Sequence, residues 1–318
     1  MIRRLVNPYK DHIVKYVAPS GGDYTTTAAA LAAITDAAAG KRYVILHDNP
    51  NEVIDTQLTW KQYVSLVGFG RSRSKVSGAV SQALLTVPWD CDIHGMTLQN
   101  TNTGNSWVVG GVKGAVNIRD CALISNGADN IYVNAASSTL TVENSYLSGK
   151  FDILVSQAGD SVRTYMRNVD VFTDAGEDAK ILRIVTGDIL ERVRVVAQLP
   201  AGAESVVGVQ GAGTLYGCSV DLALANINPV YGIEANGGTL TVIDTTVRTA
   251  HEDRYETRFD LRVSGSGVMN VSNCQYDDTK VDGTPVQIDR TPWQAHGRLT
   301  MTSAQLGRML YNQWRRQA

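Results

Sequence analysis

The hexads Ile118-Arg119-Asp120-Cys121-Ala122-Leu123 and Val142-Glu143-Asn144-Ser145-Tyr146-Leu147 share one pattern: apolar, any, turn-former, small or apolar, any, apolar. A degenerate copy begins at Leu66, with Gly68 in third place. Six further copies lie at Ile93–Leu98, Met166–Val171, Leu190–Val195, Leu215–Val220, Val242–Val247 and Val271–Tyr276. The start-to-start spacings are 27, 25, 24, 24, 24, 25, 27 and 29 residues. A regular period of this length is typical of stacked solenoid coils.

The third hexad position predicts a sharp turn in each coil. It is Gly, Asp or Asn in eight of nine copies, and these residues adopt a positive φ at low cost; Arg192 is the exception. Positions four and six share one side of a strand, because side chains alternate along a strand. We therefore expect positions one, four and six to be buried from Ile93 to Tyr276. The pattern predicts an all-β chain, a right-handed parallel β-helix of about nine coils.

Charges at the exposed second position give an independent check on this register. Four successive coils place Arg119, Glu143, Arg167 and Glu191 there, with strictly alternating sign. Stacked strands lie about 4.8 Å apart, so these side chains are expected to be neighbours. Each exposed pair contributes only about 0–1 kcal/mol, so the ladder supports the alignment of the coils more than their stability.

The two ends differ from the coils and predict caps. Residues 1–41 are expected to form an N-terminal arm and a capping helix that starts near Thr26 and runs to about Ala39, with Leu31 and Ile34 inward and Gly40 as its stop. Residues 42–290 form the β-helix. Residues 291–318 are expected to carry a C-terminal helix, because Thr302-Ser303-Ala304-Gln305 matches a capping box. This helix serves either as a lid on the last coil or as an oligomer contact.

The N-terminal region carries a resemblance to a known superfamily. Gly-Gly-Asp-Tyr-Thr-Thr at 21–26, the Ala-rich helix and the segment Val64–Gly70 resemble the N-terminal cap of pectin-lyase-like β-helix proteins. That superfamily includes pectinesterases, polysaccharide lyases and bacteriophage tailspikes, so the resemblance implies the fold and leaves the function open. Neither the pectinesterase catalytic motifs nor the Trp-Ile-Asp-His stretch of pectate lyases is recognised in the sequence.

Composition argues against several function classes. The net charge of −2 and the pI of about 6.2 give no basic field for nucleic acid or acidic membranes. No run of 18 apolar residues predicts a membrane span, and no apolar signal segment follows Arg3-Arg4. The four cysteines show no CxxC spacing and are expected to be buried free thiols. Neither a metal nor a cofactor is expected.

Candidate catalytic groups are few. Sugar-cleaving β-helices commonly use the groove along one sheet, where Glu234 is the only carboxylate expected. The other outward residues there are Asn134, Ser156, Arg183, Gln210 and Arg262. Glycosidases generally need two carboxylates, so this face predicts little chemistry. Asp90 and Asp92 are a second candidate pair, because they could share one side of a strand. The competing interpretation for all such acids is solvated loop charge.

These observations favour a virion structural protein, a β-helical tailspike-like or capsid-decorating appendage assembled in the host cytoplasm. Its expected partners are other virion proteins, cell-surface polysaccharide and two further copies of the chain in a homotrimer. The residues expected to mediate this association are Trp293, Leu306, Met309, Leu310 and Trp314. The alternative is a polysaccharide-degrading lyase or glycoside hydrolase whose acids come from loops.

Overall fold

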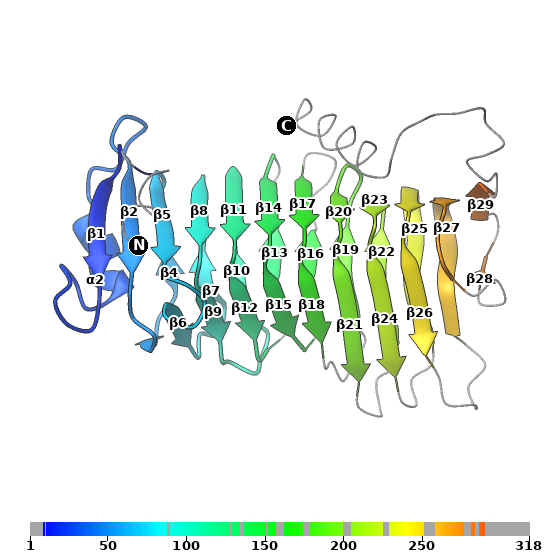
Figure 1. The fold of residues 1–318 in the computed structure, drawn as a ribbon, viewed down its shortest axis with the longest axis horizontal. Coiled ribbons are helices and arrows are strands. Elements are labelled where there is room, and N and C mark those ends of the chain that lie inside the picture. Colours follow the sequence, from blue (N-terminus) through cyan, green and yellow to red (C-terminus); the bar gives the residue numbers. More distant parts are fainter. Residues whose placement is uncertain are drawn as a thin grey trace.

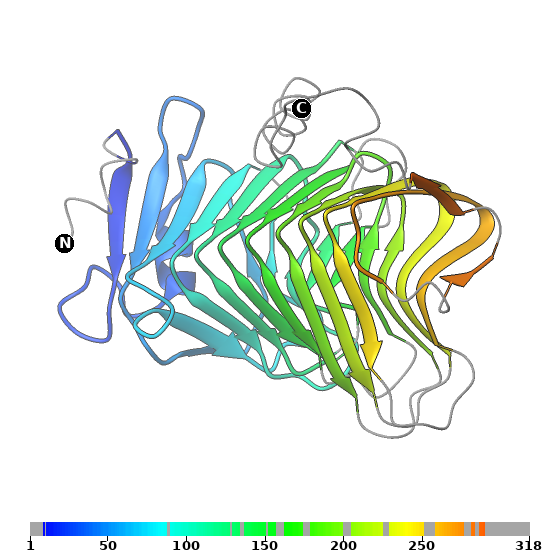
Figure 2. The ribbon, with the colours of Figure 1, turned by 45° about the vertical axis from the view of Figure 1, so that its right-hand side comes forward.

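A computed structural model shows the chain as a long stack of parallel coils (Figures 1 and 2). It describes residues 9, 11–87, 90–127, 129–133, 137–150, 152–156, 162–173, 179–199, 205–224, 229–250, 258–276, 281–283 and 286–289. Its one described α-helix, α2 (Thr27–Ala33), is too short to cross a membrane. The fold matches the expected right-handed parallel β-helix.

One sheet of the stack has nine strands. This sheet runs through β3 (Glu52–Ile54), β6 (Lys75–Gly78), β9 (Thr97–Asn100), β12 (Ala122–Ser125), β15 (Tyr146–Gly149), β18 (Asp170–Thr173), β21 (Arg194–Leu199), β24 (Ser219–Leu224) and β26 (Thr246–Ala250).

The remaining strands join in a 20-stranded sheet whose members form two rows. The first row precedes the hexad turn: β2 (Tyr43–His47), β5 (Val64–Gly68), β8 (Cys91–His94), β11 (Ala115–Arg119), β14 (Thr139–Glu143), β17 (Arg163–Arg167), β20 (Ile189–Glu191) and β23 (Gly213–Tyr216). The second row is β4 (Leu58–Thr59), β7 (Ala83–Thr86), β10 (Trp107–Gly110), β13 (Ile131–Val133), β16 (Leu154–Ser156), β19 (Ala179–Ile184) and β22 (Val206–Gly211). The long strands β25 (Val230–Ile243) and β27 (Arg258–Ser272) run through both rows, and β28 (Val281–Asp282) and β29 (Val286–Asp289) follow them.

The hexad prediction holds in the copies from Ile93 to Val247 and holds only in part in the last copy. Positions one, four and six are buried in the copies from Ile93 to Val247, and they form part of one continuous core. In the last copy, Cys274 and Tyr276 are half-buried. Position three has a positive φ in all eight copies from Gly95 to Asn273, including Arg192 at 54°. Gly68 is different. It is the last residue of β5 and does not have a positive φ, because the first coil turns two residues later, at Gly70.

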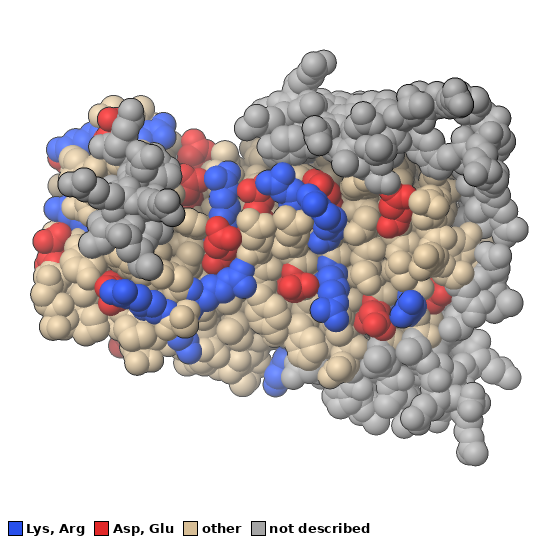
Figure 3. Space-filling model, viewed as in Figure 1, with Lys and Arg blue, Asp and Glu red and all other residues tan. Residues whose placement is uncertain are grey.

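The charge ladder lies in the expected register. Arg119, Glu143, Arg167 and Glu191 are paired across β11, β14, β17 and β20. Glu143 forms ion pairs with Arg119 at 3.4 Å and with Arg167 at 2.6 Å. Figure 3 shows acidic and basic side chains interspersed over the described part of this face, without a large area of a single charge.

The N-terminal cap differs from its prediction in extent. Helix α2 begins after the cap Thr26 but ends at Ala33, so Gly40 is not its stop. Leu31 and Ile34 are buried, as expected. A strand that the sequence did not predict, β1 (Ile13–Val17), pairs with β2 and covers the first coil. The expected C-terminal helix and its apolar residues Trp293, Leu306, Met309, Leu310 and Trp314 lie outside the described residues.

Candidate functional site

A cluster of charged and aromatic side chains lies where the second row of strands begins. Tyr132, Val155, Arg183, Gln210 and Glu234 occupy equivalent positions on β13, β16, β19, β22 and β25. A second column lies three residues before the first column along the chain. It includes Trp107, Asp129, Asp152 and Tyr231. Residues of the second column contact residues of the first column on the next coil, and this arrangement brings two carboxylates into the cluster.

Asp129 is the unusual acid of the cluster. Its Oδ2 accepts a hydrogen bond of 2.7 Å from the indole Nε1 of Trp107. Burial, with the nearby charge of Asp152 in support, raises the pKa of Asp129 to about 6, against the opposing effects of the Trp107 hydrogen bond and Arg183. A carboxyl group with such a pKa is protonated in mildly acidic solution, which suits a general acid.

Asp152, one coil further along, is held differently. Its Oδ1 accepts from the Lys180 backbone N–H at 2.7 Å, and its Oδ2 pairs with Arg183 Nη2 at 2.6 Å. Burial raises the pKa of Asp152, and the Lys180 amide and Arg183 oppose this effect. Both partners favour the ionised form and so limit the rise in the pKa of Asp152, whereas the pKa of Asp129 rises to about 6.

An aromatic platform adjoins these acids. The rings of Trp107 and Tyr132 are stacked, with centroids 5.2 Å apart and planes inclined by 25°. Both side chains are half-buried, so part of the aromatic surface stays open to solvent. Such surfaces commonly pack against the apolar faces of sugar rings while polar groups nearby bind the hydroxyls.

Glu234, the acid expected on this face, is engaged in structural contacts. It is 4% exposed, accepts hydrogen bonds from Gln210 at 2.6 Å and Ser264 at 2.9 Å, and pairs with Arg262 at 3.4 Å. Arg262 also lies over the Tyr231 ring, 4.1 Å from its centroid, and pairs with Asp282 at 3.4 Å. These contacts occupy both oxygens of Glu234, as Lys180 and Arg183 occupy both oxygens of Asp152, whereas only Oδ2 of Asp129 has a hydrogen-bond partner among the described residues.

The expectation of a single carboxylate on this face is therefore wrong. Where the sequence predicted regular alternation, Asn130 and Ile131 are both fully buried, as are Ile153 and Leu154. Asp129 and Asp152 directly precede these pairs of inward residues; Asp129 is half-buried and Asp152 is 8% exposed. The same change of phase puts Val155, in place of the expected Ser156, in the row that contains Tyr132 and Arg183. The expected Asn134 lies outside the described residues.

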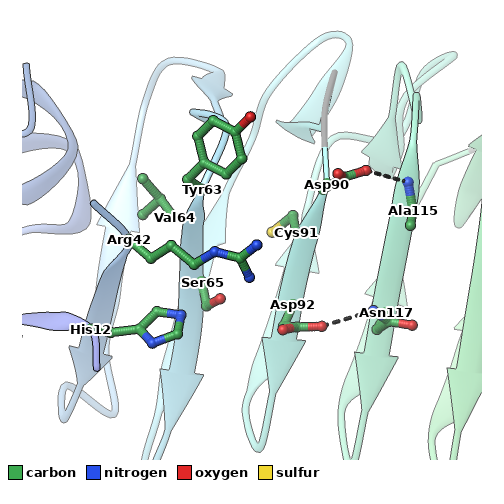
Figure 4. Close-up of a pocket in the computed structure, with 10 residues that line it drawn as sticks. All are labelled: His12, Arg42, Tyr63, Val64, Ser65, Asp90, Cys91, Asp92, Ala115 and Asn117. Carbon is green, nitrogen blue, oxygen red and sulfur yellow. Dashed lines mark hydrogen bonds between the residues drawn. The ribbon is translucent and has the colours of Figure 1, made fainter. Parts of the chain in front are cut away.

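Asp90 and Asp92 line a separate depression on the outer face of β8, so they do share one side of the strand, as expected (Figure 4). Asp90 Oδ1 accepts from the Ala115 backbone N–H at 2.7 Å, and Asp92 Oδ1 accepts from Asn117 Nδ2 at 2.8 Å. Neither aspartate belongs to the Asp129–Asp152 cluster.

The other polar candidates are dispersed. His47 is buried against Glu52 at 2.7 Å, and His94 pairs with Asp120 at 2.9 Å. Within the described ranges, no group of three or more His, Cys, Asp or Glu residues could hold a metal ion. All four cysteines are free thiols, as expected; Cys91, Cys121 and Cys218 are buried and Cys274 is half-buried.

Comparison with known proteins supports the fold. No protein-family model and no curated protein matches the sequence. The solved pectin methylesterase from carrot aligns with a TM-score of 0.50 at 12% identity, over 87% of this chain and 86% of that one. The pectin methylesterase from Aspergillus niger gives a TM-score of 0.49 at 12% identity, over 88% and 97%. The enzyme from Yersinia enterocolitica gives 0.47 at 9% identity, over 82% and 94%. The likeness to the carrot enzyme agrees with a parallel β-helix fold, and none of these structures supports the tailspike character.

Proposed function

We propose that the chain is a carbohydrate-active hydrolase whose reacting groups are Asp129 and Asp152. The observation that carries this proposal is the difference between the two carboxyl groups: the pKa of Asp129 is about 6, while Asp152 is paired with Arg183. A carboxyl group that holds a proton up to about pH 6, beside a carboxyl group paired with an arginine, suits acid–base hydrolysis of a sugar derivative. This proposal follows the alternative of a polysaccharide-active enzyme in place of a non-catalytic role.

The first substrate class to test is a carboxylic ester on an acidic polysaccharide. The ionised Asp152 oxygen would attack the ester carbonyl carbon, and the departing alkoxide would take the proton of Asp129. Water, deprotonated by the Asp129 carboxylate, would then attack the resulting anhydride, which releases the acid and restores Asp152. Arg183 orients the Asp152 carboxylate and lowers its basicity. The names of the solved pectin methylesterases motivate this choice of ester, and glycoside hydrolysis by the same two acids is the second candidate.

The test is a panel of methyl-esterified, acetylated and unmodified polysaccharides, with released alcohol or acid and new reducing ends measured separately. Release of methanol or acetate supports the ester reaction, and new reducing ends support glycoside cleavage. In either case Asp129→Asn and Asp152→Asn should each lower kcat by about 10²-fold or more. The surface control Asp170→Asn should leave kcat unchanged. A wild-type protein without turnover on the whole panel would overturn the hydrolase proposal.

The pH profile supplies a second readout. The acid form of Asp129 is lost as the pH rises through its pKa of about 6, so kcat should fall above that pH. Asp129→Asn should remove this decline together with most of the activity. Placement on a virion and binding to cell-surface polysaccharide remain predictions.

A further inference from the structure

The depression on the outer face of β2, β5, β8 and β11 has the features of a separate ligand-binding site. It has a volume of about 200 Å³, and the residues that matter for its chemistry are Arg42, Ser65, Asp90, Asp92 and Asn117, with His12 at its margin. Figure 4 shows the Arg42 side chain extending across β5 toward Asp92, while Ser65 forms part of the floor. The small side chains of Ser65 and Ala115 leave the space open.

Several polar groups that face this space lack partners. Ser65 is 7% exposed, and its hydroxyl has no hydrogen bond among the described residues. Asp90 and Asp92 each use only Oδ1, so both Oδ2 atoms are available. The buried Nδ1 of His12 has no partner either. The Arg42 guanidinium forms no ion pair or hydrogen bond within the described residues, and it lies 5.9 Å from the centroid of the Tyr63 ring.

The charge of the depression is negative. Burial lowers the pKa of His12, and Arg42 lowers it further, so this side chain is neutral near pH 7. Asp90 and Asp92 then outweigh Arg42, which leaves a net charge of −1 on the lining. A ligand with one positive charge complements this arrangement, and a uronate or phosphate does not.

We infer that this depression binds a small ligand with one primary ammonium group beside several hydroxyls, of the size of a single unacetylated amino sugar. The ammonium donates to Asp90 Oδ2 and Asp92 Oδ2, the two carboxylate oxygens that have no partner among the described residues. Arg42 and Ser65 then bind the ring hydroxyls. One carboxylate oxygen of each aspartate is already fixed by β11, so both acids are oriented before the ligand arrives. The site is separate from the Asp129–Asp152 cluster and does not depend on the proposed hydrolase activity.

The experiment is a calorimetric or ligand-observed NMR titration of the full chain with D-glucosamine near pH 7. D-glucosamine should bind at least tenfold more tightly than D-glucose, N-acetyl-D-glucosamine or ethanolamine. The first two lack the ammonium group, and ethanolamine lacks the ring. Added salt should weaken the binding, because it depends on charge.

Variants separate this site from the rest of the molecule. Asp92→Asn should weaken glucosamine binding at least tenfold, the double variant Asp90→Asn/Asp92→Asn should abolish it, and Ser65→Val should block it by filling the floor. The control Asp129→Asn should bind like the wild type, and thermal melting shows whether each variant is folded. Equal binding of glucose and glucosamine, no binding of glucosamine, or binding unchanged in the folded double variant would each overturn the inference.

Discussion

Asp188 is the buried acid with the clearest consequence for stability. Its side chain accepts hydrogen bonds from the backbone N–H groups of Thr164 at 2.7 Å and Val185 at 2.9 Å. Burial nevertheless raises its pKa from 3.8 to about 7, because desolvation of the charge outweighs these bonds and the attraction of Arg163. The folded protein therefore holds this proton more tightly than the unfolded chain.

The sign of the resulting pH dependence follows directly. The contribution of Asp188 to the free energy of unfolding is largest below pH 3.8 and is lost progressively as the pH rises from 3.8 to about 7. Each unit of pKa difference corresponds to about 1.4 kcal/mol. Urea unfolding at several pH values should show a steeper loss of stability across this window in the wild type than in Asp188→Asn. Parallel curves for the two proteins would contradict the assignment.

Arg192 carries conformational strain that its counterparts avoid. Its φ of 54° is in the left-handed region, where Asn168 and Gly217 hold the same position on the neighbouring coils. This conformation costs an ordinary L-residue about 1–2 kcal/mol, and Asn tolerates it better. The ion pair of Arg192 with Glu191 is exposed on the arginine side and contributes little.

Arg192→Asn should therefore raise the free energy of unfolding by about 1 kcal/mol, as measured by urea denaturation. An asparagine there could also extend the hydrogen bond that Asn168 donates to Asn144 at 3.0 Å. The matched control is Asn168→Arg, which introduces the same strain one coil earlier and should lower stability by a similar amount. A destabilising Arg192→Asn would contradict this account.

At the scale of elements, Glu52 ties the N-terminal cap to the first coil. This residue of β3 is 2% exposed; its Oε1 accepts from the Thr27 N–H at 2.6 Å, and its Oε2 accepts from the Thr27 hydroxyl at 2.7 Å. His47 on β2 contacts the same oxygen, Oε2, at 2.7 Å. One side chain therefore connects α2, β2 and β3.

Glu52→Ala should destabilise the protein by about 3–5 kcal/mol, because it leaves buried polar groups of Thr27 and His47 without a partner. Hydrogen exchange should show that the backbone amides of α2 and β2 lose protection first, since each coil contacts mainly its neighbours. Asp170→Ala, which removes an exposed acid opposite Arg194, is the control and should cost less than about 1 kcal/mol. Similar losses in the two variants would show that Glu52 does not hold the cap.

The elements also show what the sequence can predict. The hexad specifies the coils because small or apolar residues recur at its inward positions in every copy after the first, so an exception at one position does not change the period. The corner that leads into the second row breaks the alternation: Asn130 and Ile131 on one coil, and Ile153 and Leu154 on the next, are consecutive inward residues that directly follow Asp129 and Asp152. The Asp90–Asp92 pair was found because β8 alternates regularly. Features that depend on one local irregularity, including the early end of α2, were missed.

For the whole molecule, association remains a prediction that depends on residues 291–318. In the sequence, Leu306, Met309, Leu310 and Trp314 fall on one face of the expected helix. Closed threefold association would bury identical apolar faces without forming filaments. Light scattering should give three times the chain mass of 34.4 kDa for the full-length protein. A truncation after residue 290 should keep its β-rich circular dichroism and scatter as a single chain, whereas a monomeric full-length protein would exclude the trimer.

The continuity of the core makes the whole molecule sensitive to one charge at an inward position. Leu147 is fully buried and is stacked between Leu123 and Val171 on adjacent coils. Leu147→Asp would put an unpaired carboxylate into this dry interior, at a cost of several kcal/mol, comparable to the entire stability of a typical domain. The variant should fail to give soluble protein with a cooperative thermal transition. Ser148→Asp is the matched control, because the next residue points outward and should cost less than about 1 kcal/mol. A soluble Leu147→Asp that melts cooperatively near the wild-type temperature would mean that the side chains of β15 face the opposite way and that the hexad register is wrong.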